Sequence, residues 1–333
     1  MIIDTHAHYA PQAMLDALKS GAGSFPSVEL LHKDDKYRLS FAGRDPTRPL
    51  SPKLRDAEQR LAWMGEQGID HQVTSGWLDS FGYELPAAEG AAWSRFINEH
   101  LISATAGSDK LTPLGSVPLQ DGKMAAEVLS EALEAGFPGV MIGTLPFGGS
   151  GNLDDPTLDP FWQTASDLGA TVFIHPMFGC GDPRLLDYEM MNAVGRGTDT
   201  TTAVARLLFS GHFLKYTGMK VVLPHGGGAL PYMLGRLIRN YDVHRDQCAD
   251  PAEGMRRVYF DSIVFDADTL RYLRGKFGAG RIMLGSDYPF PIGDLEPVKV
   301  VREAGLEEIE VGQILGETAA RIFRVETPCG CQG

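Results

Sequence analysis

The sequence predicts an α/β fold, a (β/α)8 TIM barrel, from the alternation of two kinds of segment. Between apolar, β-branched segments lie stretches such as 54–68 and 121–136, whose apolar residues repeat every three or four positions and which end in glycine. Such alternation is typical of parallel β-α units, and eight strands match the barrel. The eight candidate strands are 1–4, 71–77, 111–117, 139–143, 170–175, 219–225, 257–262 and 281–287. A doubly wound open sheet is the alternative, but no glycine-rich phosphate turn follows the first strand.

The chain is predicted to form one domain over residues 1–325, with 326–333 as a loose C-terminal tail. A length of 333 residues is compatible with a single α/β barrel. Two connections are unusually long, a first insertion over roughly residues 10–53 after the first strand and a second over roughly 177–218 after the fifth. Because the loops that follow barrel strands form the catalytic face, both insertions are expected to cover a substrate.

The composition excludes several classes of protein. Hydrophobic residues make up 43% and charged residues 22% of the chain, as in an ordinary globular protein. A net charge of −13 argues against nucleic acid or an anionic membrane as a partner. No apolar segment is long enough to span a bilayer and no signal peptide is recognisable, so we expect a cytoplasmic protein.

The cysteines do not indicate a disulfide framework. There are four of them, irregularly spaced: Cys180, Cys248, Cys329 and Cys331. Cys329 and Cys331 fall in the predicted tail, so we interpret them as part of a loose terminus and not as a metal site.

Polar residues at the ends of the predicted strands indicate a metal site. In MIIDTHAHYAP, His6 and His8 are two apart, so on an extended strand both point the same way. His175, His225 and Asp287 end the fifth, sixth and eighth strands. One histidine after a strand is more often structural than a ligand, but five polar residues at the same end of four strands are hard to explain by coincidence. Imidazoles with a carboxylate suit zinc with a position open for water.

Other features near these residues have ordinary structural interpretations. Five further histidines show no such placement, and His71 begins a strand, which places it at the opposite end of the barrel. The five are His32, His71, His100, His212 and His244. The glycines at 226–228 either let the backbone approach a ligand or form a tight turn, and the sequence leaves both open.

Four motifs resemble the amidohydrolase superfamily in its decarboxylase branch, and within it the 2-amino-3-carboxymuconate-6-semialdehyde decarboxylase family. They are DTHAHY, IHP at 174–176, PHGGGALPYMLGR at 224–236 and LGSDYPFPIGDLEP at 284–297. The resemblance implies one Zn²⁺ held by His6, His8, His175 and Asp287, with His225 as the catalytic acid/base that activates a zinc-bound water. Relatives that use Mn²⁺ instead tend to carry a glutamate in place of His6 or His8.

The resemblance also implies substrate-binding residues. Arg236 matches a position that reaches across a homodimer interface to hold a substrate carboxylate, although a surface arginine on a helix is the alternative. A second arginine is expected from the early loop, where Arg44, Arg48 and Arg55 compete and Arg48 is our candidate. Met177, which replaces a family tryptophan, and Phe290 are expected to line the pocket.

The sequence therefore predicts a metal-dependent, non-oxidative decarboxylase of a small unsaturated or aromatic carboxylic acid, in a catabolic pathway. A metal-dependent hydrolase or hydratase that acts on a lactone, an amide or a carbon–carbon bond is the alternative, since the same barrel and metal serve both. A binding protein with a relic site would require an incomplete ligand set, and here the set is complete.

Overall fold

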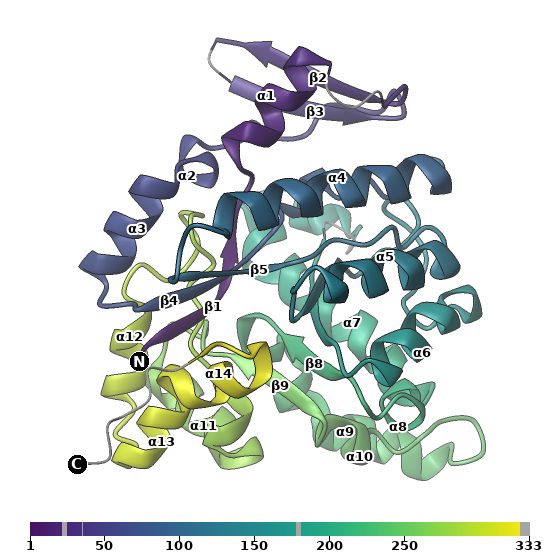
Figure 1. Ribbon diagram of the computed structural model, residues 1–333. Helices are drawn as coiled ribbons and strands as arrows, with labels where there is room; N and C mark the ends of the chain where they lie inside the picture. Colours follow the sequence, from purple (N-terminus) through teal and green to yellow (C-terminus); the bar gives the residue numbers. More distant parts are fainter. Residues whose placement is uncertain (22–24, 35, 178–180, 327–333) are drawn as a thin grey trace.

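A computed structural model describes residues 1–21, 25–34, 36–177 and 181–326 of the chain (Figure 1). Eight parallel strands lie in or beside the eight predicted segments, which confirms the α/β class. They are β1 (Ile3–His8), β4 (His71–Ser75), β5 (Leu111–Leu114), β6 (Gly139–Gly143), β7 (Thr171–His175), β8 (Lys220–Leu223), β9 (Val258–Asp261) and β10 (Ile282–Met283).

Hydrogen bonds connect these strands in a ring. The sheets run in the orders β1-β4-β5 and β10-β9-β8-β7-β6. At one junction Gly115 N donates to Gly139 O (3.0 Å), which joins the end of β5 to β6. At the other junction His8 N donates to Tyr288 O (2.8 Å), which joins β1 to the segment after β10. This connectivity is consistent with the predicted (β/α)8 barrel.

Amphipathic helices surround the strands (Figure 1). In α5 the residues that are buried recur at helical spacing, and the Asp121 side chain caps its first turn by accepting hydrogen bonds from Lys123 N and Met124 N. Two further helices, α7 (Arg196–Phe209) and α11 (Ala267–Phe277), likewise bury one side. The other helices that accompany the strands include α3 (Ala57–Glu66), α4 (Ala87–Thr105), α5 (Gly122–Glu134), α6 (Asp159–Asp167), α9 (Leu230–Val243), α12 (Pro297–Glu303), α13 (Glu308–Gly312) and α14 (Thr318–Phe323).

The connection from β1 to β4 contains structure that the sequence analysis did not assign. It holds α1 (Gln12–Ser20), an antiparallel hairpin of β2 (Val28–Lys33) and β3 (Lys36–Phe41), and α2 (Pro52–Arg55). Figure 1 shows the hairpin and α1 beyond the C-terminal end of β1. Trp93 of α4 anchors this layer, because its ring packs against Phe25 and Phe41 (centroids 5.2 and 5.6 Å apart). Arg48 follows the hairpin in the chain and therefore lies near the C-terminal end of β1.

The connection from β7 to β8 is the second long one. It contains a short helix at Met191–Gly195, then α7 and α8 (His212–Lys215), and α10 (Pro251–Met255) follows later in the chain. This connection begins at the end of β7 that carries His175. Both insertions therefore start at the C-terminal end of a barrel strand.

One large hydrophobic cluster fills and surrounds the strands and includes residues from Ile3 to Val325. No helix in the described part of the chain is long and apolar enough to cross a bilayer. Cys180, Cys329, Cys331 and nearly all of the predicted tail lie outside the described residues. The single domain over 1–325 and the loose tail stay predictions.

Candidate active site and metal centre

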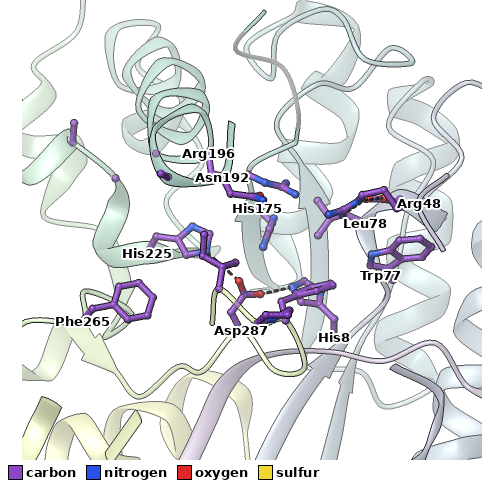
Figure 2. A pocket seen from close by; sticks show the side chains of 18 residues that line it. His8, Arg48, Trp77, Leu78, His175, Asn192, Arg196, His225, Phe265 and Asp287 are labelled. Carbon is purple, nitrogen blue, oxygen red and sulfur yellow. Dashed lines mark hydrogen bonds and ion pairs between the residues drawn. The ribbon is translucent and has the colours of Figure 1, made fainter. Parts of the chain in front are cut away.

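The structure brings together all five polar residues that the sequence predicted at the strand ends, and Figure 2 shows all of them except His6. His6 and His8 end β1, His175 ends β7, His225 follows β8 and Asp287 follows β10. The imidazoles of His6 and His8 are fully buried. The His175 ring centroid lies 5.0 Å from that of His6 and 5.0 Å from that of His8. Figure 2 shows the Asp287 carboxylate between His225 and His8.

The donor atoms of this group are close enough to share one ion. Those of His6, His175, His225 and Asp287 all lie within 4.8 Å of one another. His8 is not in that set, but its Nε2 lies 3.2 Å from Asp287 Oδ1. The same oxygen lies 3.6 Å from His6 Nε2, whereas Asp287 Oδ2 faces His225 Nε2 at 3.7 Å.

Unpartnered buried atoms indicate which side chains fit a metal. Among the described residues, no hydrogen bond reaches Nε2 of His6, His8 or His175, nor Oδ1 of Asp287. Each of these imidazoles bonds instead through Nδ1, respectively with Asp261 Oδ2 (2.8 Å), Gly76 O (3.3 Å) and Pro176 O (2.9 Å). A hydrogen bond at Nδ1 leaves the Nε2 lone pair for a cation, as in most metal sites with histidine ligands. The donor set therefore fits one divalent ion.

His225 differs from the other histidines. Its side chain is 22% exposed, and Nδ1 is the nitrogen without a hydrogen-bond partner in the described structure. Its backbone φ of 54° begins a tight turn in which Gly226 and Gly228 also have positive φ. A Cβ on Gly228 would lie 2.5 Å from Gly197 O, so only glycine fits there. This turn presents the His225 imidazole to the cavity described below.

For Asp287, His175 and His8, burial and charge favour protonation states that suit a cation. Burial opposes charge on Asp287, but the neighbouring imidazoles of His225, His8 and His6 together outweigh burial and hold the pKa of Asp287 well below its usual range. Burial, with the charges of the neighbouring histidines, lowers the pKa of His175 well below its usual value, and burial lowers the pKa of His8. His6 is the exception: burial alone would lower its pKa, but the hydrogen bond to Asp261 and the charges of the nearby carboxylates together outweigh burial and raise the pKa. An ionised carboxylate and neutral imidazoles are the forms that bind metals.

A cavity of about 580 Å³ opens above this group. Of the four predicted substrate-binding residues, Arg48 and Phe290 line it. Met177 lies outside the lining; its backbone N donates to Asp199 Oδ2 (2.7 Å) and its sulfur packs against Gly143. Arg236 is exposed on α9 and also lies outside the lining. The lining comprises His8, Arg48, Trp77, Leu78, Asp79, His175, Asn192, Ala193, Arg196, Gly197, His225, Gly228, Ala229, Phe265, Asp287, Phe290, Pro291 and Ile292.

The structure separates the three competing arginines of the early loop. Arg48 lines the cavity and pairs with Asp79 through two hydrogen bonds of 2.9 and 3.1 Å. Arg44 donates to the Gly148 carbonyl, and Arg55 stacks over the ring of Tyr37, so neither lines the cavity.

None of the five histidines that we interpreted as structural lines the cavity. Both ring nitrogens of His71 are bonded within 3.1 Å, to Asp109 O and Thr112 Oγ1. It begins β4, at the end of that strand remote from the site.

Sequence reasoning missed Asp261 and Arg196. Asp261 ends β9, so the rule that selected His175 and Asp287 also applies to it. Arg196 is the first residue of α7, in a long insertion where no strand end marks it.

Comparison with known proteins agrees with this site. A family model described as Amidohydrolase matches residues 3–325, and the chain belongs to the amidohydrolase family. The 2-amino-3-carboxymuconate-6-semialdehyde decarboxylase of Dictyostelium discoideum is 31% identical over 307 residues, which cover 90% of this chain and 84% of that protein. Gamma-resorcylate decarboxylase of Rhodococcus jostii (strain RHA1) is 30% identical over 273 residues, covering 72% and 80% of the two chains. The resemblance that the motifs indicated is thereby confirmed.

Solved structures share the fold. The 5-carboxyvanillate decarboxylase of Sphingomonas paucimobilis superposes with a TM-score of 0.79 at 24% identity, over 98% of this chain and 99% of that one. The 5-carboxyvanillate decarboxylase of Novosphingobium aromaticivorans, complexed with manganese and 4-hydroxy-3-methoxy-5-nitrobenzoic acid, has a TM-score of 0.78 at 20% identity. The match covers 97% of this chain and 96% of that one.

Beneath the metal ligands, Asp4 connects β1 to the segment that carries Asp287. It lies on the same face of β1 as His6 and is fully buried. Its carboxylate accepts hydrogen bonds from Ser286 N (3.0 Å) and Gln72 Nε2 (2.7 Å). Burial raises the pKa of Asp4 to about 6, although these hydrogen bonds favour the charged form.

This shift predicts the sign of one pH effect. Because the folded-state pKa of Asp4 lies above the unfolded value of 3.8, the folded protein binds the proton more tightly and loses stability as pH rises from about 4 to about 6. Between pH 4.5 and 7, metal-free wild type should lose about 2 kcal/mol of unfolding free energy relative to Asp4→Asn. Urea unfolding of both proteins at the two pH values measures this, and a pH-independent difference would contradict it.

Proposed function

We propose that this protein is a zinc-dependent, non-oxidative decarboxylase of a small unsaturated or aromatic carboxylic acid, in a catabolic pathway. The observation that carries the proposal is the convergence of three unpartnered imidazole nitrogens and one carboxylate oxygen at the base of a cavity. His6, His8, His175 and Asp287 would hold the ion. The relatives named above that share 30% or more of their residues with this chain are called decarboxylases, which favours loss of carbon dioxide over hydrolysis.

The reaction replaces a carboxylate on carbon by a proton. When bound, a divalent ion supplies a Lewis acid that stabilises negative charge on a substrate oxygen as carbon dioxide leaves. His225, on the cavity wall, holds the proton and delivers it to the carbon that carried the carboxylate. Arg48 binds an anionic group of the substrate through its planar guanidinium. Trp77 and Phe290 provide apolar surface for a flat substrate.

Substitution of His225 distinguishes a catalytic role for this residue from a role in metal binding. His225→Asn should lower kcat for carbon dioxide release at least about 100-fold, with zinc still bound at one ion per chain. The measurements are carbon dioxide release from carboxymuconate semialdehydes and hydroxybenzoates, and metal content by elemental analysis. His244→Asn, which changes an exposed histidine, is the matched control.

Two results would contradict these assignments. Loss of zinc in His225→Asn would indicate that His225 is a metal ligand. That role is compatible with the structure, because its donor atom is one of the four that lie within 4.8 Å of one another. Product that retains all its carbon, from ring opening or water addition by the wild type, would replace the decarboxylase by the hydrolase or hydratase.

The choice of zinc rests on the donor set. Three imidazoles and one carboxylate suit zinc, which favours nitrogen ligands, whereas manganese favours oxygen. Mn²⁺ is the alternative, because the related Novosphingobium structure contains manganese. Metal-free protein reloaded with Zn²⁺ should regain activity, and the carbon dioxide assay after reloading with each ion measures this. Recovery with Mn²⁺ alone would overturn the choice of zinc.

We propose further that the protein acts in the cytoplasm as a homodimer in which Arg236 reaches the partner's active site. Arg236 is exposed on α9, the helix that follows the His225 turn, and Tyr232 one turn earlier is 85% exposed. An exposed arginine and tyrosine on one helix face are common at protein interfaces.

Subunit mixing tests the placement of Arg236. Arg236→Met and His225→Asn should each be inactive alone. When the two are co-expressed, a mixed dimer contains one site with both native residues, so random pairing should restore about a quarter of wild-type activity, since it forms one intact site in every four. Native mass spectrometry verifies that mixed dimers form. Mixed dimers without activity would show that Arg236 serves its own subunit, whereas an active Arg236→Met protein would show that Arg236 serves no site.

A further inference from the structure

A second cavity, of about 610 Å³, adjoins the first at the turn that carries His225. Among the described residues, His225, Gly228 and Phe265 line both cavities. Figure 2 shows Phe265 beside His225, on the side remote from Trp77 and Arg48. His225 has the catalytic role proposed above and Gly228 has no side chain, so the side chain of Phe265 is the remaining barrier at this boundary.

We propose that Phe265 is a specificity-determining residue: its ring is the wall between the two cavities and restricts the active site to acids with one aromatic ring or an equally short chain. The inference rests on the proposed function and sets the size limit of its substrate. Without this ring, the second cavity would become part of the substrate-binding site.

Hydrogen bonds hold the segment of Phe265 against the His225 turn. Asp261 Oδ1 accepts one from Gly226 N (3.0 Å), within the turn. The same oxygen accepts another from Ile263 N (3.2 Å), two residues before Phe265. Phe265 therefore follows a backbone that is tied directly to the residue next to His225.

The conformation of Phe265 is unusual for a large side chain. Its φ is 58°, in a region that glycine adopts freely and where a bulky residue is an outlier. Its ring is 60% exposed, as expected for a side chain with open space on two sides. The next residue, Asp266, caps α11 by accepting a hydrogen bond from Thr269 N (2.7 Å), which fixes the backbone on this side too. Such backbone outliers concentrate at functional sites, which favours a role for the ring beyond packing.

The second cavity would accept an uncharged ring. Apart from the shared residues, most of its lining is apolar or aromatic: Pro231, Tyr232, Ile263, Val264, Tyr272 and Leu273. Two polar side chains of the lining already have partners, since Asp268 pairs with Arg271 and Thr269 Oγ1 donates to Asp266 Oδ2 (2.7 Å). An aromatic group fits such a surface better than a charged group does.

A contribution of Phe265 to the start of α11 is the competing explanation. The residue before a helix cap often packs against the fourth residue of the helix, which is the buried Leu270 here. Loss of such a contact would affect the binding of all acids alike. Loss of a wall would favour the longer acids only. The ratio of the affinity for a two-ring acid to that for benzoate therefore separates the two explanations.

Three variants isolate the ring. Phe265→Ala removes it and Phe265→Tyr keeps it. Tyr188→Ala is the matched control, because Tyr188 also has a positive φ (57°), is 91% exposed and lies outside both linings. If Phe265→Ala does not fold, Phe265→Gly replaces it, since glycine adopts a positive φ without strain.

The test is calorimetric titration of zinc-loaded protein with benzoate and with the ortho, meta and para isomers of phenylbenzoate. In Phe265→Ala the affinity ratio should rise about tenfold over wild type for at least one isomer, as burial of roughly 60 Å² of its second ring supplies. In Phe265→Tyr and Tyr188→Ala the ratio should stay within about threefold of wild type. A crystal structure of the Phe265→Ala complex should place the second ring beside Tyr232 or Tyr272.

The inference would be wrong if Phe265→Ala bound no phenylbenzoate or kept the wild-type ratio for all three isomers. It would also be wrong if the ratio rose equally in Phe265→Tyr or Tyr188→Ala, or if the second ring lay outside the second cavity. The titrations need no turnover. A size limit set by Phe265 in a protein that releases no carbon dioxide would contradict only the proposed reaction, and carbon dioxide release with an unchanged ratio would contradict only this inference.

Discussion

The buried carboxylate of Asp261 holds the site together. Its Oδ2 lies 2.8 Å from His6 Nδ1, while Oδ1 accepts hydrogen bonds from Gly226 N (3.0 Å) and Ile263 N (3.2 Å). One side chain at the end of β9 thus sets the ring orientation on β1 and the path of the turn that presents His225. Since Asp261 is completely buried, its carboxylate oxygens depend on these partners in place of water. The positions of the proposed metal ligand His6 and the proposed catalytic residue His225 are therefore not independent of one another.

Much of the fold follows from local sequence pattern. Apolar segments predicted eight strands, and amphipathic stretches predicted the helices between them. The spacing of the apolar residues and the length of the segment distinguish a strand from a helix. The hairpin of β2 and β3 was missed because it packs on Trp93 of α4, more than fifty residues away, and that contact is not visible in its own residues. The last strand is only Ile282–Met283, since the chain beyond it turns, with Asp287 at φ 60°.

The centre of the site was predictable and its walls were not. His6, His8, His175, His225 and Asp287 share one signal, a polar residue where an apolar strand ends, and parallel strands end on the same side. Arg196 lies in a helix within a long insertion, so its place depends on how that insertion folds back. Arg48 and Met177 were both candidates for substrate binding, yet of these two only Arg48 lines the cavity, because the Met177 side chain packs against Gly143.

The proposed metal ligands are spread along the chain from His6 through His175 to Asp287, which bears on how the protein is made. Ser286, next to Asp287, is 280 residues from His6. A ribosome releases the histidines of β1 early, while Asp287 follows only when the barrel is nearly complete. Closing so long a loop must come before all four ligands can meet. Binding of an ion by all four proposed ligands would therefore belong to the last stage of maturation, and it would stabilise the finished barrel and not the intermediates that lead to it.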